Sequence, residues 1–175
     1  MSFSVVVNDL LYEPVDCIVN PANGGLSHGG GVAAAISQAA GSALDDECEK
    51  IIQDHGRIPV GHAVVTTAGN LSYKGVIHAV GPRLGEGDEE NKLVQALCQA
   101  CMRAAENGWS SLSFPAVSSG IFAVPHDVCA RAYVRAPSEY YKRFPDTSLK
   151  TVRVCLYNGP LVDMVLREMS KVEEP

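Results

Sequence analysis

The chain lacks any long apolar stretch. No run approaches the roughly 18 apolar residues that a membrane span needs, and Asp9, Glu13 and Asp16 interrupt the region where a signal peptide would be apolar. Basic residues are also scarce, since 14 Lys and Arg stand against 20 Asp and Glu, for a formal net charge of −6. Proteins that wrap duplex nucleic acid usually carry a basic face. We therefore expect a soluble, intracellular protein, in the cytoplasm, the nucleus or both, with no membrane partner and no tight binding of duplex nucleic acid.

Metal-binding and disulfide patterns are missing as well. The 5 histidines show no HxxxH or HExxH spacing. Cys98 and Cys101 form a CxxC, but it lies inside the helical-looking stretch Asn91–Asn107, and no second CxxC or paired histidine completes a zinc set. Because the chain has no secretion signal and enough apolar sequence to build a core, its 6 cysteines are predicted to be buried and reduced. We predict no metal and no cofactor.

Length and composition indicate one globular domain. The chain has 175 residues, of which 46% are hydrophobic and 19% charged. Short β-branched runs predict strands at Phe3–Val7, Cys17–Val19, Ala63–Thr66, Val76–Val80, Leu112–Phe114 and Val152–Tyr157. Amphipathic stretches predict helices at Gly31–Ala40, Ala43–His55, Glu89–Asn107, Val124–Tyr141 and Leu161–Lys171. This alternation predicts a three-layer α/β/α sandwich with a central mixed, mostly parallel sheet. The start in a strand and the tail Glu173–Pro175 suggest that residues 1–175 are a single domain cut from a longer chain, and we expect it to be monomeric.

Two strand-to-helix junctions are unusually rich in small residues. The first, Asn20–Gly31, follows the predicted strand Cys17–Val19 and ends in three successive glycines. The second, Phe114–Phe122, also begins at the end of a strand. In open α/β sheets, ligands gather at the carboxyl ends of strands, where loops lead into helix N-termini. No acidic residue occurs at positions 17–44, so nothing neutralises the positive end of the helix that follows the glycines. Its free N–H groups predict an anion site.

Neither loop carries a basic side chain, because no Lys or Arg precedes Lys50 and none lies between Arg103 and Arg131. A phosphate would therefore be held by backbone N–H groups and hydroxyls, which suits a diphosphate in a cleft. We expect its affinity to fall only slightly with salt, unless a residue such as Arg83 or Arg131 reaches the cleft. The loops match neither a P-loop nor the GxGxxG spacing of a Rossmann fold. Either loop alone is equally well explained as a tight turn, but two at matching strand ends favour a site.

Several segments together resemble the macrodomain family of ADP-ribose-binding modules. Asn20-Pro21-Ala22-Asn23 followed by His28–Ala33 is similar to the family's NAAN…GGGVA signature. Ile77–Pro82 is similar to its H-x-V-G-P segment, and Phe114–Phe122 to its second binding loop. Asn8-Asp9-Leu10 stands where the family has Gly-Asp-Ile, and the resemblance extends nearly end to end. The first macrodomain of multi-macrodomain ADP-ribosyltransferases (macro-PARPs) is most similar, with viral macrodomains next.

The resemblance implies roles for individual residues. Asp9 would accept a hydrogen bond from the adenine amine, although by itself it is better explained as a turn or cap residue. Leu10 and Tyr157 would flank the adenine, while Val32 and the Ser118–Phe122 loop would hold the diphosphate. Asn23 would bind the distal ribose. The full set implied to contact ADP-ribose is Asp9, Leu10, Asn23, His28, Gly29, Gly30, Gly31, Val32, Ser118, Ser119, Gly120, Ile121, Phe122, Tyr157 and Asn158, and those tied to catalysis are Asn23, Gly30 and Phe122.

Members of this family either bind ADP-ribose or remove it from mono-ADP-ribosylated proteins. One hydrolase branch has an aspartate where this chain has Ala33, which argues against an enzyme. The viral and macro-PARP hydrolases also lack it and resemble this chain in keeping the Asn, the glycines and the second loop. For them a substrate-assisted mechanism is implied, in which the bent diphosphate helps to orient the water. We therefore expect hydrolysis of mono-ADP-ribose from Asp and Glu side chains, with a non-catalytic reader and removal of ADP-ribose from nucleic-acid ends as alternatives. A serine nucleophile is disfavoured because Ala116–Gly120 lacks the first glycine of a GxSxG elbow.

Overall fold

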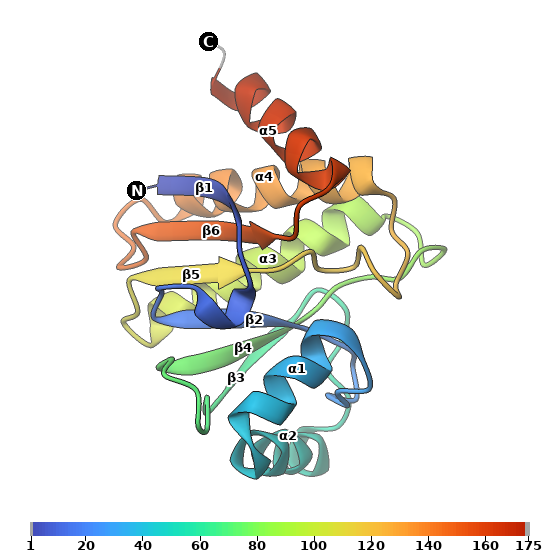
Figure 1. Cartoon of the computed structure of the whole chain (residues 1–175), viewed down its shortest axis with the longest axis vertical. Helices are drawn as coiled ribbons and strands as arrows, with labels where there is room; N and C mark the ends of the chain where they lie inside the picture. Colours follow the sequence, from blue (N-terminus) through green and yellow to red (C-terminus); the bar gives the residue numbers. More distant parts are fainter. Residues whose placement is uncertain (1, 174–175) are drawn as a thin grey trace.

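A six-stranded sheet organises the computed structural model, which describes residues 2–173 (Figure 1). The strand order is β1-β6-β5-β2-β4-β3, with all neighbours parallel except the antiparallel pair β3 and β4. The strands are β1 (Ser2–Val7), β2 (Cys17–Ala22), β3 (Ala63–Thr66), β4 (Gly75–Val80), β5 (Ser111–Phe114) and β6 (Thr151–Leu156). The helices are α1 (Gly31–Ala40), α2 (Ser42–His55), α3 (Glu89–Glu106), α4 (His126–Arg143) and α5 (Pro160–Glu173), with a short 3-10 helix η1 (Leu10–Tyr12). The predicted sandwich with a mixed, mostly parallel sheet is confirmed.

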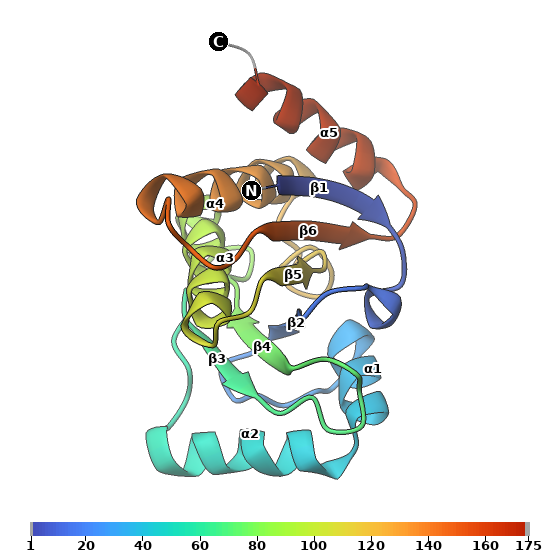
Figure 2. The same cartoon turned by 90° about the vertical axis from the view of Figure 1, so that its left-hand side faces the viewer.

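The sheet separates two apolar cores, and Figure 2 shows helices on both of its faces. One core joins the strands to the buried sides of α3, α4 and α5. The other, smaller core joins them to η1, α1 and α2. The central strands β2, β4 and β5 are buried along most or all of their length, which explains their continuous apolar runs, whereas the edge strand β1 is partly exposed. All 6 cysteines are free and buried, as predicted.

Three predicted boundaries were wrong in ways that bear on the site. Strand β2 does not end at Val19 but continues to Ala22, because its ladder with β4 extends that far while its pairing with β5 stops at Ile18. Pro21 is tolerated there because the β5 side of the strand has no partner to receive an N–H. Strand β6 ends at Leu156, which leaves Tyr157 in the loop beyond the sheet. Helix α4 begins at His126, because the preceding residue Pro125 has extended backbone (ψ 145°) and is the N-cap, which leaves Val124 in the loop with its N–H donated to Ser118 O.

Met1, Glu174 and Pro175, which include the end of the acidic tail noted above, lie outside the described residues. Over residues 2–173, no helix combines the length and the apolar character required to span a bilayer.

Candidate functional site

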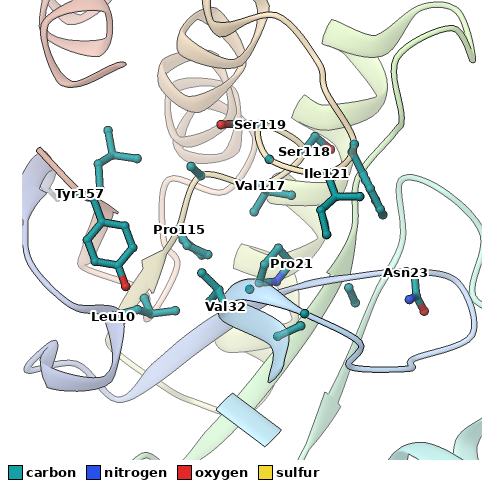
Figure 3. A pocket seen from close by; sticks show the side chains of 18 of the residues that line it. Leu10, Pro21, Asn23, Val32, Pro115, Val117, Ser118, Ser119, Ile121 and Tyr157 are labelled. Carbon is teal, nitrogen blue, oxygen red and sulfur yellow. The ribbon is translucent and has the colours of Figure 1, made fainter. Parts of the chain in front are cut away.

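A cleft of about 410 Å³ opens at the carboxyl ends of β2, β5 and β6. Its volume lies within the usual range for small-molecule sites. The separation of β2 from β5 beyond Ile18 creates this opening, because the loops after the two strands diverge to either side. Figure 3 shows Leu10 and Tyr157 at one end and Asn23 at the other, with Ile121 and Val32 between them. The cleft is therefore elongated and bounded by two loops that the sequence singled out.

The N-terminus of α1 and the glycines before it form one wall. Gly30 is the N-cap residue, has extended backbone and makes no side-chain cap, and the first turn of α1 contains no acidic residue. Gly31 has φ +57°, a left-handed conformation that favours glycine. The first N–H groups of a helix have no partner within the helix, and here the helix dipole adds a positive potential to them. This wall is suited to an anion, as predicted.

The opposite wall is the Pro115–Phe122 loop. Two of its turns are closed by hydrogen bonds from Ser119 N to Ala116 O at 3.2 Å and from Ala123 N to Gly120 O at 3.0 Å. Ser118 has φ +66°, and its Oγ is buried without a hydrogen-bond partner. A Cβ on Gly81 would lie 2.3 Å from that Oγ, so only glycine at position 81 leaves room for Ser118. Packing against Gly81 thus holds the loop in the conformation that forms this wall.

The two walls face one another closely at Gly30 and Ile121. A Cβ added to Gly30 would lie 3.8 Å from Ile121 Cδ1, which is an ordinary van der Waals contact. Ile121 is 86% exposed, so it forms an apolar cover over the middle of the cleft rather than part of the core. A ligand lying between the two loops would be enclosed at this point.

Asn23 is held in place by its own loop. Its Nδ2 donates to the backbone O and to the Oγ of Ser27, both at 2.9 Å, and its Oδ1 accepts from Ser27 N at 3.1 Å. These contacts use both Nδ2 hydrogens and leave one acceptor position on Oδ1. Asn23 thus offers a fixed acceptor to a hydroxyl at its end of the cleft.

Asp9 does not line the cleft. Its side chain caps η1, with Oδ1 accepting from Leu11 N at 2.9 Å, which is the cap role that its position alone suggested. The neighbouring Asn8 and Leu10 line the cleft instead. Their position is secured by Glu13, which accepts from Asn8 at 2.7 Å, from Ser113 at 2.7 Å and from Arg153 at 2.8 Å. Burial alone would raise the pKa of Glu13, but these hydrogen bonds outweigh it and hold the pKa below 4.5.

His28 and Asn158 are also absent from the cleft lining. The His28 side chain turns to the other side of the glycine loop, where its Nε2 lies 3.7 Å from Asp45 Oδ1 and its Nδ1 lies 3.4 Å from Asn20 Nδ2. The implied contact of His28 with the sugar therefore has no support in this geometry. Asn158 is exposed beyond β6. The remaining implied residues do line the cleft, namely Leu10, Asn23, Gly29, Gly30, Gly31, Val32, Ser118, Ser119, Gly120, Ile121, Phe122 and Tyr157.

Arg83, one of the two basic residues that the sequence left open as reaching the cleft, does line it. Its guanidinium lies 4.6 Å from the centroid of the Phe122 ring, and Leu84 N donates to Phe122 O at 2.8 Å. The condition set for a weak effect of salt on affinity is therefore not met, and we now expect a moderate effect. The signal was available, since Arg83 follows Ile77–Pro82 and the carboxyl end of β4 lies beside that of β2. Arg131 is instead paired with Glu90 and Asp127.

The cleft holds no conventional general base. Among the described residues that line it there is no Asp, Glu or His, and Ala33 occupies the wall where a carboxylate would act. Burial raises the pKa of the lining thiol Cys155 to about 12, so it is protonated at neutral pH. What the cleft can do is bind and orient an anionic ligand, with the proton acceptor supplied by the ligand or by water.

Comparison with known proteins agrees with this geometry. The Macro domain family matches residues 19–133. The O-acetyl-ADP-ribose deacetylase of Escherichia coli K12 is 44% identical over 141 residues, which cover 79% of this chain and 80% of that protein. A Thermotoga maritima protein is 44% identical over 153 residues, which cover 86% of this chain but only 26% of the relative, so this chain spans about a quarter of that protein. A mutant of the Oceanobacillus iheyensis macrodomain, solved with ADPR, superimposes with a TM-score of 0.90 at 26% identity and covers 98% of this chain and 93% of its own.

The relatives compared are bacterial, so the particular likeness to macro-PARP and viral macrodomains stays a prediction. The wider assignment does not depend on it. A family match over most of the chain, a relative 44% identical over most of its own length and a solved macrodomain with the same fold establish that the chain belongs to the Macro domain family.

Proposed function

We propose that the cleft binds ADP-ribose and that the domain hydrolyses carboxylate esters of its distal ribose, including mono-ADP-ribose on Asp and Glu side chains. The observation that carries this proposal is the cleft itself. One wall is a helix N-terminus without acidic residues, the other is the uncharged Pro115–Phe122 loop, and the lining contains no carboxylate to repel a diphosphate.

The elongated cleft is suited to a ligand whose base, diphosphate and sugar contact different residues along its length. The adenine would lie between Leu10 and Tyr157, which is 69% exposed and free to pack on a ring. The diphosphate would lie at the N-terminus of α1, opposite the Ser118–Phe122 loop. The distal ribose would then reach Asn23, whose Oδ1 retains one acceptor position.

The relatives support a hydrolase over a binding module. The Escherichia coli relative is named for removing acetate from O-acetyl-ADP-ribose, and an ADP-ribosylated Asp or Glu is likewise an ester of a carboxylic acid with the ribose. Both reactions need a water beside the ester and release a carboxylate. Since no lining residue is a conventional base, we infer that a diphosphate oxygen orients the water, while Asn23 and the two loops position the ribose.

The same lack of a base supports the second candidate, a reader that binds mono-ADP-ribosylated proteins without cleaving them.

Calorimetry tests binding, which both candidates require. ADP-ribose is expected to bind one-to-one with micromolar affinity, roughly −7 to −8 kcal/mol. Adenosine should bind far more weakly because it lacks the diphosphate. If ADP-ribose gives no binding heat at protein concentrations well above micromolar, the cleft has been misassigned.

Release of product separates the two candidates. The domain is incubated with O-acetyl-ADP-ribose and, separately, with a protein auto-modified with mono-ADP-ribose on acidic side chains, and free ADP-ribose is followed over time. Turnover of both substrates supports ester hydrolysis. Release from the small ester alone would restrict the activity to O-acetyl-ADP-ribose. Binding without release from either would identify a reader.

A further inference from the structure

A second cluster of chemically reactive side chains lies behind the glycine loop, outside the cleft. His28 from the loop, Cys48 from α2 and His78 from β4 bring one ligand-type atom each to within 4.8 Å of one another. Cys48 Sγ and His78 Nε2 are 3.8 Å apart. Spacing rules could not find this group, because its members come from three separate elements. We propose that His28, Cys48 and His78 form a binding site for a zinc-like divalent cation, with Asp45 as the fourth ligand.

The donor set matches the chemistry of such a cation. Two imidazoles, one thiolate and one carboxylate are ligands that Zn²⁺ takes in four-coordinate sites. Asp45 is one turn before Cys48 on α2, and its Oδ1 lies 3.7 Å from His28 Nε2. A cation with a charge of +2 would be balanced by one thiolate and one carboxylate, so the loaded site would bury no net charge.

One ring nitrogen of the cluster has no hydrogen-bond partner. His28 Nε2 is buried and has no hydrogen-bond partner, and the His28 side chain is only 7% exposed. A buried polar atom left unpaired costs about 1–3 kcal/mol, so such atoms in folded proteins call for an explanation. A cation between His28 Nε2 and the Cys48 thiol supplies one.

Asn20 provides the outer support that metal-binding histidines usually have. Its Nδ2 position lies 2.9 Å from His78 Nδ1 and 3.4 Å from His28 Nδ1, so one amide contacts the same ring atom of both histidines. With the amide turned so that Oδ1 faces the rings, both Nδ1–H groups would donate to it and both Nε2 lone pairs would be free for the cation. The atom at the other amide position lacks a partner in either orientation.

Binding of a cation moves one proton within the site and releases another. Without a cation, His78 donates from Nε2 to Thr66 Oγ1 at 2.8 Å, and burial lowers its pKa to about 3, so the ring is neutral. On binding, the hydrogen bond between His78 Nε2 and Thr66 Oγ1 breaks and the Thr66 hydroxyl moves aside, the His78 proton is carried on Nδ1, and Nε2 bonds the cation. Burial raises the pKa of the Cys48 thiol to about 12, so it gives up one proton to solvent as the metal–sulfur bond forms.

The geometry needs a modest contraction. Ligand atoms around tetrahedral zinc lie roughly 3.3–3.6 Å apart, given bond lengths of about 2.0–2.3 Å. The Cys48–His78 distance is already near that value, and the other distances among His28, Cys48 and His78 must shorten by up to about 1.5 Å from the 4.8 Å limit. The Asp45 carboxylate lies near His28 but outside that limit for the group as a whole, so its side chain must move closer to complete the set. A surface depression lined by His28, Ser37, Asp45 and Glu49 borders the cluster and offers a route for a cation. Because His28 directly precedes Gly29–Gly31, the cation would also tether the loop that forms one wall of the cleft.

Metal retention tests the site. The protein is stripped with a chelator under reducing conditions, given one equivalent of Zn²⁺, passed over a desalting column and analysed for metal. We expect about one Zn²⁺ per chain and, from calorimetry in buffers of different ionisation enthalpy, one proton released per metal. With Co²⁺ we expect a thiolate charge-transfer band and intensified visible bands typical of tetrahedral coordination.

Matched variants distinguish this cluster from adventitious binding. Cys48→Ala should weaken Zn²⁺ binding by more than about a hundredfold, since even outer-shell changes cost 10–100-fold. Cys98→Ala, which removes a buried thiol from α3, and His126→Gln, which removes an exposed histidine, should bind as the wild type does. If circular dichroism shows that Cys48→Ala does not fold, His28→Gln carries the comparison, because His28 lies in a loop. Failure of the wild type to retain Zn²⁺, or equal retention by the cluster variants, would overturn the proposal.

Discussion

Substitution of Gly30 by glutamate tests the location of the diphosphate most directly. Gly30 has φ −174°, an extended conformation open to any residue, and a Cβ there would meet only Ile121 Cδ1 at 3.8 Å. The fold should therefore accept the side chain. A carboxylate at the N-cap of α1 should even stabilise that helix by about 0.3–1 kcal/mol.

The same carboxylate should abolish ligand binding. It would enter the space between Gly30 and Ile121 and take the place that we assign to the diphosphate. Two unit charges about 4 Å apart repel by about 4 kcal/mol at the effective dielectric constant of a protein surface. That energy corresponds to about a thousandfold loss, from micromolar to millimolar affinity.

Calorimetry with ADP-ribose and a thermal melt should be run on three proteins, namely the wild type, Gly30→Glu and Gly30→Gln. Glutamine matches glutamate in size without its charge, so it reports the steric part of the loss and should retain more affinity. The melting temperature of Gly30→Glu should not fall below that of the wild type. A Gly30→Glu protein that binds ADP-ribose within about tenfold of the wild type would place the diphosphate elsewhere.

Four further predictions concern single residues. Asn23→Ala should reduce the rate of hydrolysis by about a hundredfold in the release assay while the fold survives. The control Ser27→Ala keeps the Asn23 amide and should reduce the rate much less. Similar reductions in the two variants would show that Asn23 acts only by shaping its loop. Asp9→Ala should lower the free energy of unfolding by about 1 kcal/mol in urea through loss of the η1 cap and, because Asp9 lies outside the cleft lining, should leave ADP-ribose affinity nearly unchanged in calorimetry. A loss of about 1–3 kcal/mol of binding in the folded variant would instead show that Asp9 contacts the ligand. Arg83→Gln should weaken ADP-ribose binding by up to about 1 kcal/mol and make the affinity measured by calorimetry less dependent on salt concentration. If the affinity of the variant depends on salt as that of the wild type does, the guanidinium does not contact the ligand. Because the fold lowers the pKa of Glu13 below its usual value of 4.5, the hydrogen bonds of its carboxylate stabilise the protein above pH 4.5, and this stability is lost as the pH falls through the lowered pKa. Glu13→Gln should therefore lower the free energy of unfolding in urea by about 3 kcal/mol at pH 7 and make stability less sensitive to acid. Equal stability of the variant and the wild type at pH 7 would refute this role.

Local sequence pattern was sufficient for the architecture. Every predicted strand and helix exists, because β-branched runs and amphipathic periodicity are properties of neighbouring residues. The two loops of the cleft could be found in the same way. Gly29–Gly31 and Ser118–Gly120 lie in the loops that follow β2 and β5, and the carboxyl ends of parallel strands meet at one edge of the sheet, so their approach follows from the fold class.

Tertiary structure decided where side chains point. Asp9 and His28 are adjacent in sequence to lining residues, but one caps η1 and the other turns behind the glycine loop, because each finds its hydrogen-bond partners there. Arg83 reaches the cleft only because β4 ends beside β2. The meeting of His28 with Cys48 and His78 likewise depends on α2 packing over β3 and β4. Sequence thus determined which elements form and which loops share an edge, whereas the direction of each loop side chain was set by contacts with residues distant along the chain, which no local pattern encodes.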